Sequence, residues 1–564
     1  MPRYSAVERW RLARHAAQQA LSRARRASAL PLRTFSDWRA RGPQRLVIAP
    51  QDIRTSDPTI ADDISAGYFA FGSRIVDTRG ASPFALPPPT PEWEAALMGF
   101  GWLRHLRAAE NALARENARA LVDDWLAAHG RPREGTSWTP TVAARRLLSW
   151  VSQSPLLLEG ADAGFYRRFL RGLGRHIAYL RGEMRGGLEG DARLFAAVAL
   201  VQATLCSEGY ASLRKRAGKW LTDELGAQIL PDGGHIGRNP QTLVDLLLDL
   251  LPLRQAYLAR NVAAPPELVG AIDRMMPMLR AFRHPDSALA LFNGMGVTAP
   301  DTLATVLAYD DARAQPILNA PYSGYQRLEG EGAVLLFDAG GAPPPAFSRR
   351  AHAGALAFEL SLDNQRLVVN CGAPATQNPA LRVAARSTAA HSTLCLDGES
   401  SARLPDEEDG FAAGRIVIGP SAPRAVRQDL AAGAVAEATH DGYASRFGLL
   451  HSRQVALAAD GARAEGVDRL TRAPGAKAAQ SAQEAVIRFH LHPAVRAEPL
   501  EADQGVALTL PGGEVWVFHA SGAPVAIEES AYFAAPDGTR ATRQLVLRAP
   551  AEDGLQMNWT FMRG

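Results

Sequence analysis

The stretch Trp93-Glu-Ala-Ala-Leu-Met-Gly-Phe-Gly-Trp-Leu-Arg-His-Leu106 begins the pattern that decides the fold of this chain. Its apolar residues recur every three or four positions, which is the spacing of one helix face. We therefore predict a long run of consecutive helices joined by short turns that contain Gly or Pro. Comparable patterns follow at 141–153, 163–182, 191–206, 211–229, 240–259 and 267–283.

The spacing of apolar residues changes near Pro321. From there, short apolar or alternating runs are separated by Gly, Asp and Pro turns, as in Ala333-Val-Leu-Leu-Phe-Asp338 and Arg415-Ile-Val-Ile418. Many short strands separated by turns are typical of a β-sandwich. The sequence thus predicts an all-helical half followed by an all-β half. No fixed-length repeat is present in the helical half, which disfavours a solenoid.

Composition limits the class of protein. A chain of 564 residues with 47% apolar and 21% charged residues is long and apolar enough for two large globular domains. The three cysteines have no C-x-x-C spacing, so neither a disulfide framework nor a zinc-thiolate site is indicated. No apolar run reaches the length of about 18 residues that a membrane-spanning helix needs. The net charge of +4 is concentrated at the start of the chain and does not indicate a nucleic-acid partner.

The first thirty residues are strongly basic. They lack the apolar stretch and the cleavage site of a secretory signal. With Trp10, Leu12 and Leu21 interleaved, they could form a helix on an anionic membrane surface or on a partner, or a solvated terminal helix. We divide the chain into a basic N-terminal helical segment at 1–44, short strands with a proline-rich connector at 45–91, a helical domain at 92–318 and a β domain at 319–564.

Several stretches resemble the heparinase II/III-like family in the expected order. The two most specific are Gln228-Ile-Leu-Pro-Asp-Gly-Gly-His-Ile-Gly-Arg-Asn-Pro240 and Ala351-His-Ala-Gly-Ala-Leu-Ala-Phe-Glu-Leu-Ser361. The resemblance implies an α+β multidomain protein, with an incomplete α/α toroid followed by an antiparallel β-sandwich. It also implies β-elimination of an acidic, uronate-containing polysaccharide. The other stretches are 137–150, 323–327, 369–372, 385–393 and 488–493.

Three positions depart from the side chains that the family commonly uses. The resemblance places an Asn, a Tyr and a His near Asp191, Thr242 and Arg350. Thr242 cannot replace a phenol as a base, because an aliphatic hydroxyl is far less acidic. Arg350 is always protonated, so it could neutralise a carboxylate but could not accept a proton.

The remaining polar residues of the expected cleft supply other candidates. As a functional pair, Arg238 would hold a uronate carboxylate and His235 would act as the base. The alternative is a tight turn at Asp232-Gly-Gly234 with a structural His235. We therefore name His235, Arg238, His352 and Arg350 as catalytic candidates. The candidates for substrate binding are Trp138, as a sugar-stacking platform, Asn239, Asp191 and Arg386.

Some members of the family bind a structural zinc ion in the sandwich through two His and one Asp. The resemblance places these ligands at His352, His391 and Asn370. A neutral amide is a poor zinc ligand, so the sequence favours loss of the metal and a hydrogen-bonded polar group instead. His490 and His492 share one strand face, where packing is the favoured role.

Three functions stay open. The first is a lyase acting on an acidic polysaccharide, and the second is a catalytically degenerate protein that binds polysaccharide or takes part in its export. The third is a toroid glycoside hydrolase, which needs two facing carboxylates from Asp191, Glu189 and Asp245. The resemblance implies a location in the cell envelope or periplasm, whereas the missing signal leaves the cytoplasm as the alternative.

Overall fold

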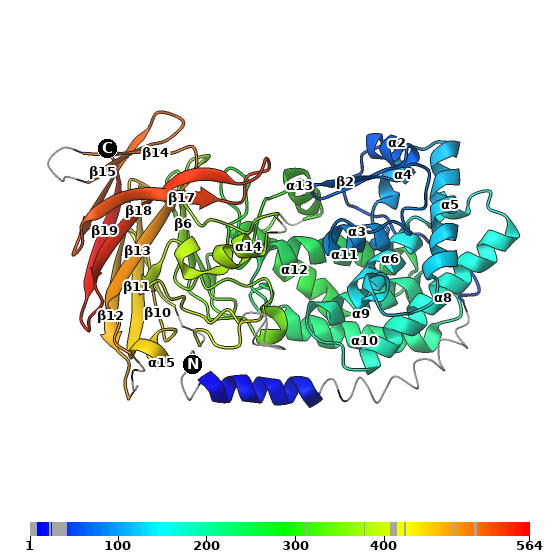
Figure 1. Cartoon of the computed structure of the whole chain (residues 1–564), viewed down its shortest axis with the longest axis horizontal. Helices are drawn as coiled ribbons and strands as arrows, with labels where there is room; N and C mark the ends of the chain where they lie inside the picture. Colours follow the sequence, from blue (N-terminus) through cyan, green and yellow to red (C-terminus); the bar gives the residue numbers. More distant parts are fainter. Residues whose placement is uncertain are drawn as a thin grey trace.

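The computed structural model describes residues 8–21, 24, 42–310, 313–376, 378–405, 414–421, 423, 425–475, 478, 480–500 and 505–564. A helical half and a strand-rich half lie side by side, and the chain passes from one to the other near residue 319 (Figure 1). This confirms the predicted toroid followed by a β-sandwich. Of the predicted N-terminal segment 1–44, the structure describes residues 8–21, 24 and 42–44, and the others lie outside the described residues. No helix in the described ranges has the length and hydropathy needed to cross a membrane.

Most helices of the first half form where the apolar spacing predicts them. Several begin at a side-chain cap, as at Thr90, Asn111 and Asp162, whose oxygens accept from backbone N–H groups of the first turn. The helices are α2 (Thr59–Ser65), α3 (Pro91–Gly99), α4 (Leu103–Ala108), α5 (Ala112–His129), α6 (Pro140–Ser152), α7 (Ser154–Leu158), α8 (Ala163–Arg185), α9 (Asp191–Leu205), α10 (Ala211–Gln228), α11 (Pro240–Ala259), α12 (Pro266–Ala281) and α13 (Pro300–Ala308). Helix α2 was not expected within 45–91, where a hairpin of β1 (Tyr68–Phe71) and β2 (Arg74–Asp77) also lies.

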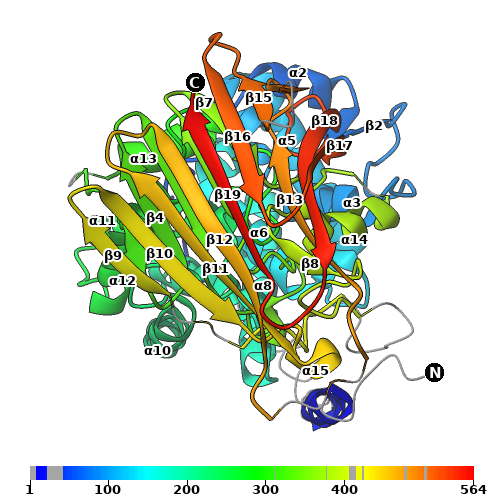
Figure 2. The same cartoon turned by 90° about the vertical axis from the view of Figure 1, so that its left-hand side faces the viewer.

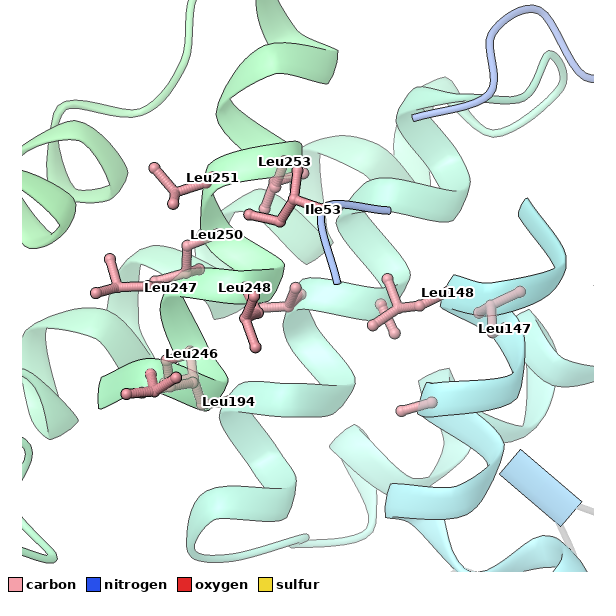
Figure 3. Close-up of a cluster of buried hydrophobic side chains, with 14 of the residues drawn as sticks. Ile53, Leu147, Leu148, Leu194, Leu246, Leu247, Leu248, Leu250, Leu251 and Leu253 are labelled. Carbon is pink, nitrogen blue, oxygen red and sulfur yellow. The ribbon is translucent and has the colours of Figure 1, made fainter. Parts of the chain in front are cut away.

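The core of the helical half lies between α6, α9 and α11. Helices α9 and α11 are buried over most of their surface, as expected for helices that are apolar almost all round. Their leucines meet those of α6 around Ile53, which is 6% exposed (Figure 3). Asp191 at the start of α9 is exposed, and Gln241 and Thr242 at the start of α11 are half-buried, so these three residues lie outside this core.

The second half is a sandwich of two antiparallel sheets. One sheet has the order β14-β15-β16-β19-β12-β11-β10-β9 and faces the viewer in Figure 2. The other has the order β17-β18-β13-β7-β6-β5-β4-β3, with β8 paired to β13. Strand β11 alternates buried and partly exposed residues along its whole length, which is typical of a strand with one face in a core.

The bounds of the sandwich elements are as follows. The strands are β3 (Asn319–Ala320), β4 (Tyr325–Gly330), β5 (Ala333–Asp338), β6 (Phe358–Leu362), β7 (Gln365–Val369), β8 (Leu394–Leu396), β9 (Val426–Leu430), β10 (Gly433–His440), β11 (Leu449–Ala458), β12 (Arg463–Arg472), β13 (Glu484–Leu491), β14 (Arg496–Pro499), β15 (Val506–Thr509), β16 (Val515–Ser521), β17 (Val525–Tyr532), β18 (Arg540–Pro550) and β19 (Gln556–Arg563). Two short helices, α14 (Pro379–Arg386) and α15 (Ala444–Phe447), interrupt them.

The described N-terminal helix, residues 8–21, runs across the boundary of the two halves, below both in Figure 1. Glu8 is buried and accepts from Arg403 and Ser445 of the sandwich half, at 3.3 and 3.4 Å. His15 lies within electrostatic reach of Glu189, in the loop before α9. The inner face of this helix therefore contacts both halves.

Candidate functional site

The two halves meet where α9 begins. Gly190 approaches the sandwich so closely that an added Cβ would lie 2.8 Å from the carbonyl oxygen of Ala346. The loop between α10 and α11 turns at Gly233, whose φ of 84° favours glycine. This loop carries His235 to the same place, since His235 Nε2 lies 3.5 Å from Asp191 Oδ1.

His235 is held inside the protein and is only 2% exposed. Its Nδ1 accepts from the backbone N–H of Gly237 at 3.0 Å, and its Nε2 faces Gln228 Oε1 at 3.3 Å. Burial lowers the pKa of His235 to about 4, so the imidazole is neutral near pH 7 with its proton on Nε2. With the lone pair of Nδ1 already used, His235 cannot act as the predicted base. It positions Asp191 instead.

Asp191 is the first residue of α9, and its side chain is 59% exposed. Partial desolvation raises the pKa of Asp191 to about 6. The positive charge of Arg350 lowers this pKa, whereas the negative charge of Asp245 raises it further. A carboxyl group with this pKa is partly protonated near neutral pH and can donate a proton.

His352 and His391 form a buried pair. His391 Nδ1 donates to the carbonyl oxygen of Ser387 at 2.7 Å, which leaves the lone pair of the neutral ring on Nε2. That nitrogen lies 3.1 Å from His352 Nδ1, so His352 donates there and keeps its own lone pair on Nε2. Within the described part of the chain, no hydrogen bond uses His352 Nε2.

The charges around His352 keep its ring neutral. Burial, then His391, Arg386 and Arg350, lower the pKa of His352 well below its ordinary value. Arg350 is exposed and lies within electrostatic reach of both His352 and Asp191. A neutral base, an exposed guanidinium and a partly protonated carboxyl therefore share one region of the junction.

The residues that resemble a zinc site do not fit the metal. Three of the four imidazole nitrogens of His352 and His391 are used in the contact between the two rings and in the contact to Ser387. The amide of Asn370 donates to Glu359 Oε1 at 3.0 Å and accepts from the N–H of Ser392 at 2.9 Å. Across the described ranges, no group of three or more His, Cys, Asp or Glu side chains is arranged to hold a metal ion. The donor set lacks the charge that a structural zinc needs.

Arg238 does not hold a ligand. Its Nε donates to Ser323 O at 2.7 Å, its Nη1 donates to Gly341 O at 2.8 Å, and its Nη2 pairs with Asp338. The guanidinium also lies over the Tyr325 ring, 4.6 Å from the ring centroid. These contacts join the helical half to the sandwich, which disfavours the predicted carboxylate clamp at Arg238.

Two other predicted contacts to substrate also change role. Trp138 is 3% exposed, donates to His129 O at 2.8 Å and stacks on His176, so it is part of the core and not a sugar platform. Arg386 donates to the carbonyl oxygens of Ala351 and Ser348 at 2.9 and 3.1 Å. It positions the segment that carries Arg350 and His352.

Asn239 keeps a place next to the site. Its Oδ1 caps α11 by accepting from Gln241 N at 2.8 Å. Its Nδ2 is buried and has no hydrogen-bond partner among the described residues. That nitrogen and the carbonyl oxygen of Arg350 both lie beside Gly294, which places the loop after His235 against the Arg350 segment.

Of the three carboxylates considered for hydrolysis, Asp191 and Asp245 lie near each other, whereas Glu189 faces the N-terminal helix. Asp245, one turn into α11, lies within electrostatic reach of Asp191 and accepts from Gln241 Nε2 at 2.9 Å. Glu189 interacts with His15 of the N-terminal helix instead. Thr242, at the position where the family has a Tyr, is half-buried on the same helix.

Sequence reasoning missed two groups that shape the site. Gln228 holds His235 and donates to Gly190 O at 3.3 Å. Phe347 packs edge-on against His235, with ring centroids 5.8 Å apart. Gln228 ends a helix and Phe347 follows a proline run, so neither carries a sequence signal for this role.

Comparisons with known proteins agree with this fold. The heparinase II/III-like C-terminal domain matches residues 312–560. FtsZ-localized protein C of Caulobacter vibrioides is 30% identical over 551 residues, which cover 93% of each chain.

Two solved structures share the fold. Heparan sulfate lyase HepC of Pedobacter heparinus, in a mutant form, has a TM-score of 0.64 at 18% identity, over 100% of this chain and 92% of that one. A crystal structure of heparinase III has a TM-score of 0.73 at 13% identity, over 95% and 89% of the two chains. At these identities the likeness concerns the fold alone.

Proposed function

The chain belongs to the heparinase II/III-like family, and from that premise we propose that it is a carbon-oxygen lyase acting on an acidic, uronate-containing polysaccharide. The proposal is carried by His352, whose Nδ1 is used by His391 so that the lone pair falls on Nε2, and which, like the protonatable Asp191, lies within electrostatic reach of the exposed Arg350. These three groups supply a base, a cation and an acid, which are the functions that β-elimination requires.

In the proposed reaction, His352 Nε2 removes the proton at uronate C5. The electron pair forms the C4=C5 double bond, the bond between C4 and the glycosidic oxygen breaks, and Asp191 gives its proton to the leaving oxygen. Arg350 offsets the negative charge that develops on the uronate carboxylate. His235 keeps Asp191 in place from the buried side.

The test is the absorbance of the unsaturated product during incubation with a panel of uronate-containing polysaccharides. We expect product with the natural chain and a loss of at least about 100-fold in rate for His352→Gln, since general-base catalysis contributes about that much or more. The matched control is His519→Gln, which changes a half-buried His on β16 of the other sheet. Equal rates for His352→Gln and the natural chain would remove His352 as the base.

A second candidate is a non-catalytic protein that binds an acidic polysaccharide. The substitutions at Asp191, Thr242 and Arg350 favour it, as does the 30% identity to a protein whose name describes localisation with FtsZ. Saturable binding of a uronate polysaccharide without any unsaturated product would select this candidate. New reducing ends without that product would select hydrolysis by Asp191 and Asp245.

The proposed location is the cell envelope or periplasm, by the family resemblance, with the cytoplasm as the alternative. We also propose a peripheral membrane contact through the N-terminal helix. Its outer face carries the exposed Trp10 and Leu21 together with Arg9, Arg11 and Arg14. Sedimentation with anionic vesicles should fall for Trp10→Glu/Leu21→Glu and should not change for Ala13→Gln. Cell fractionation decides between the two locations.

A further inference from the structure

A hollow lies on the outer surface of the helical half, between α5 and α8. These helices are at the end of the molecule farthest from the sandwich (Figure 1). The hollow has a volume of about 330 Å³ and is lined by Asp123, Leu126, Ala127, Arg168, Arg171 and Arg175. We call it the α5–α8 groove. Its volume is at the lower end of the range of about 300 to 1,000 Å³ that is typical of ligand sites.

The shape of the groove follows from the packing of the two helices. Residues 168, 171 and 175 form one stripe along α8, and residues 123, 126 and 127 form one stripe along α5. Below them, Gly172 lets the helices touch, since an added Cβ there would lie 2.8 Å from Leu126 Cδ2. The groove is therefore closed at its base and open to solvent at its rim.

The charge in the groove is unbalanced. Arg168 pairs with Asp123 through two hydrogen bonds of 2.7 and 2.8 Å. Arg171 and Arg175 each donate to a backbone carbonyl, of Arg167 at 3.2 Å and of Gly130 at 2.9 Å, and neither has a carboxylate partner among the described residues. Burial, then Arg131 and Arg171, lower the pKa of Arg175, so the cations in this region repel one another. Such an arrangement favours binding of an anion.

We propose that the α5–α8 groove binds an acidic peptide segment of a partner protein. Carboxylates of that segment pair with Arg171 and Arg175, whose remaining N–H groups have no acceptor among the described residues. Apolar side chains of the segment cover Leu126 and Ala127. Arginine clusters recognise acidic motifs in this way.

The residues that line the groove favour an acidic peptide over other classes of anionic ligand. A flat membrane surface cannot fill a hollow of about 330 Å³. The lining residues include no aromatic ring, on which a sugar or a base would stack. The mixture of aliphatic side chains and guanidinium groups fits a peptide that carries both apolar and acidic residues.

The experiment measures the fluorescence anisotropy of a labelled peptide of alternating Glu and Leu, titrated with the full chain at low and moderate salt. We expect saturable binding that weakens as salt increases. Arg171→Glu/Arg175→Glu should weaken it by at least about tenfold. The matched control, Arg463→Glu/Arg472→Glu, makes the same change of charge on exposed arginines of β12 and should bind as the natural chain does.

Two further variants test the groove and leave Arg175 unchanged, so they remain informative even if the protein does not fold with a substitution at Arg175. Ala127→Trp fills the hollow from an exposed helix position without a change of charge, and should abolish binding. Asp123→Asn releases Arg168 and adds one positive charge, so it should tighten binding by about two- to fivefold.

The proposal is overturned if the peptide binds the groove variants as it binds the natural chain, or does not bind at all. It is also overturned if heparin oligosaccharides, duplex DNA or anionic vesicles bind more tightly than the peptide and lose that binding in Ala127→Trp. The lyase assay does not enter this test, so failure here leaves the proposed elimination unaffected.

Discussion

Identical side chains in this protein have different chemistry because their hydrogen bonds differ. His235 accepts through Nδ1 and donates through Nε2, and both contacts lie inside the protein. His352 donates through Nδ1 to another His and keeps Nε2 free within the described residues. A tautomer set by a neighbour therefore decides which of the two can accept a proton.

The pKa of Asp191 gives a pH dependence for the proposed elimination. His352 is already neutral at pH 5, whereas Asp191, with a pKa of about 6, changes from mostly protonated at pH 5 to mostly ionised at pH 7. Since the reaction needs the protonated acid, kcat should fall by about tenfold for each pH unit above about 6. Product absorbance between pH 5 and 8 measures this.

The control is Asp191→Asn, which should be slow at every pH and should have lost the decline above pH 6. Asp245→Asn removes the charge that helps to raise the pKa of Asp191, so its decline should begin at lower pH. A natural profile that rises through pH 6 would contradict the role of Asp191 as the acid.

At the scale of elements, a buried ion pair within one sheet of the sandwich supports contacts to the other side of the sandwich. Arg453 of β11 and Asp468 of β12 are both fully buried and form two hydrogen bonds of 2.8 and 3.0 Å. Arg453 also donates to the carbonyl oxygens of Leu356 and Ser392, which lie in the half of the sandwich built on the other sheet. This pair fixes how the sheets lie against each other.

This ion pair predicts acid sensitivity. Burial opposes ionisation of Asp468, but Arg453 and His451 outweigh it and lower its pKa to about 2. Because the unfolded value is about 3.9, the carboxylate contributes about 2 to 3 kcal/mol of stability above pH 4, and that contribution is lost as pH falls from about 4 to about 2.

Asp468→Asn should destabilise the protein at pH 7 by about 3 kcal/mol or more, since it leaves a buried guanidinium without its charge partner. Its stability should also change less between pH 5 and pH 2. Circular dichroism during thermal unfolding measures both effects. Asp553→Asn, at a half-exposed carboxylate, is the control, and an equal effect of the two variants would contradict the prediction.

At the scale of the whole molecule, buried polar groups connect the helical half to the sandwich. Arg238 pairs with Asp338 of β5, and Asn293 donates to the same carboxylate at 3.1 Å. His284 lies 2.8 Å from Glu359 of β6, with both side chains fully buried. These contacts fix the distance between Asp191 on one side of the junction and His352 on the other.

Breaking the Arg238–Asp338 pair should separate the unfolding of the two halves. Arg238→Met leaves Asp338 buried without its cation and should cost about 3 to 5 kcal/mol. Arg238→Met/Asp338→Leu should cost less than the two single variants added together. Calorimetry should show one transition for the natural chain and two for Arg238→Met. A single transition at an unchanged temperature would show that this pair does not couple the halves.

Much of the fold could be predicted from the sequence, because helix and strand periodicity are local. The repeat of Trp93, Leu97 and Phe100 shows which helix face meets the core, and the apolar run Ala333–Asp338 marks strand β5, which is buried along its whole length. Helix α2 lacks a comparable signal, since it is short and amid prolines and turns, and it was missed.

The sequence by itself determined the fold class of each half and identified segments that meet at the junction of the two halves. It could not assign their side chains, since Arg238, Trp138 and Arg386 each carry groups that suit a ligand. Only the tertiary structure decided that these groups are used inside the protein, through partners such as Asp338, which lies 100 residues from Arg238 in the chain. Spacing along a chain reports a local geometry, whereas the availability of a donor or a lone pair depends on every group that folding brings near it.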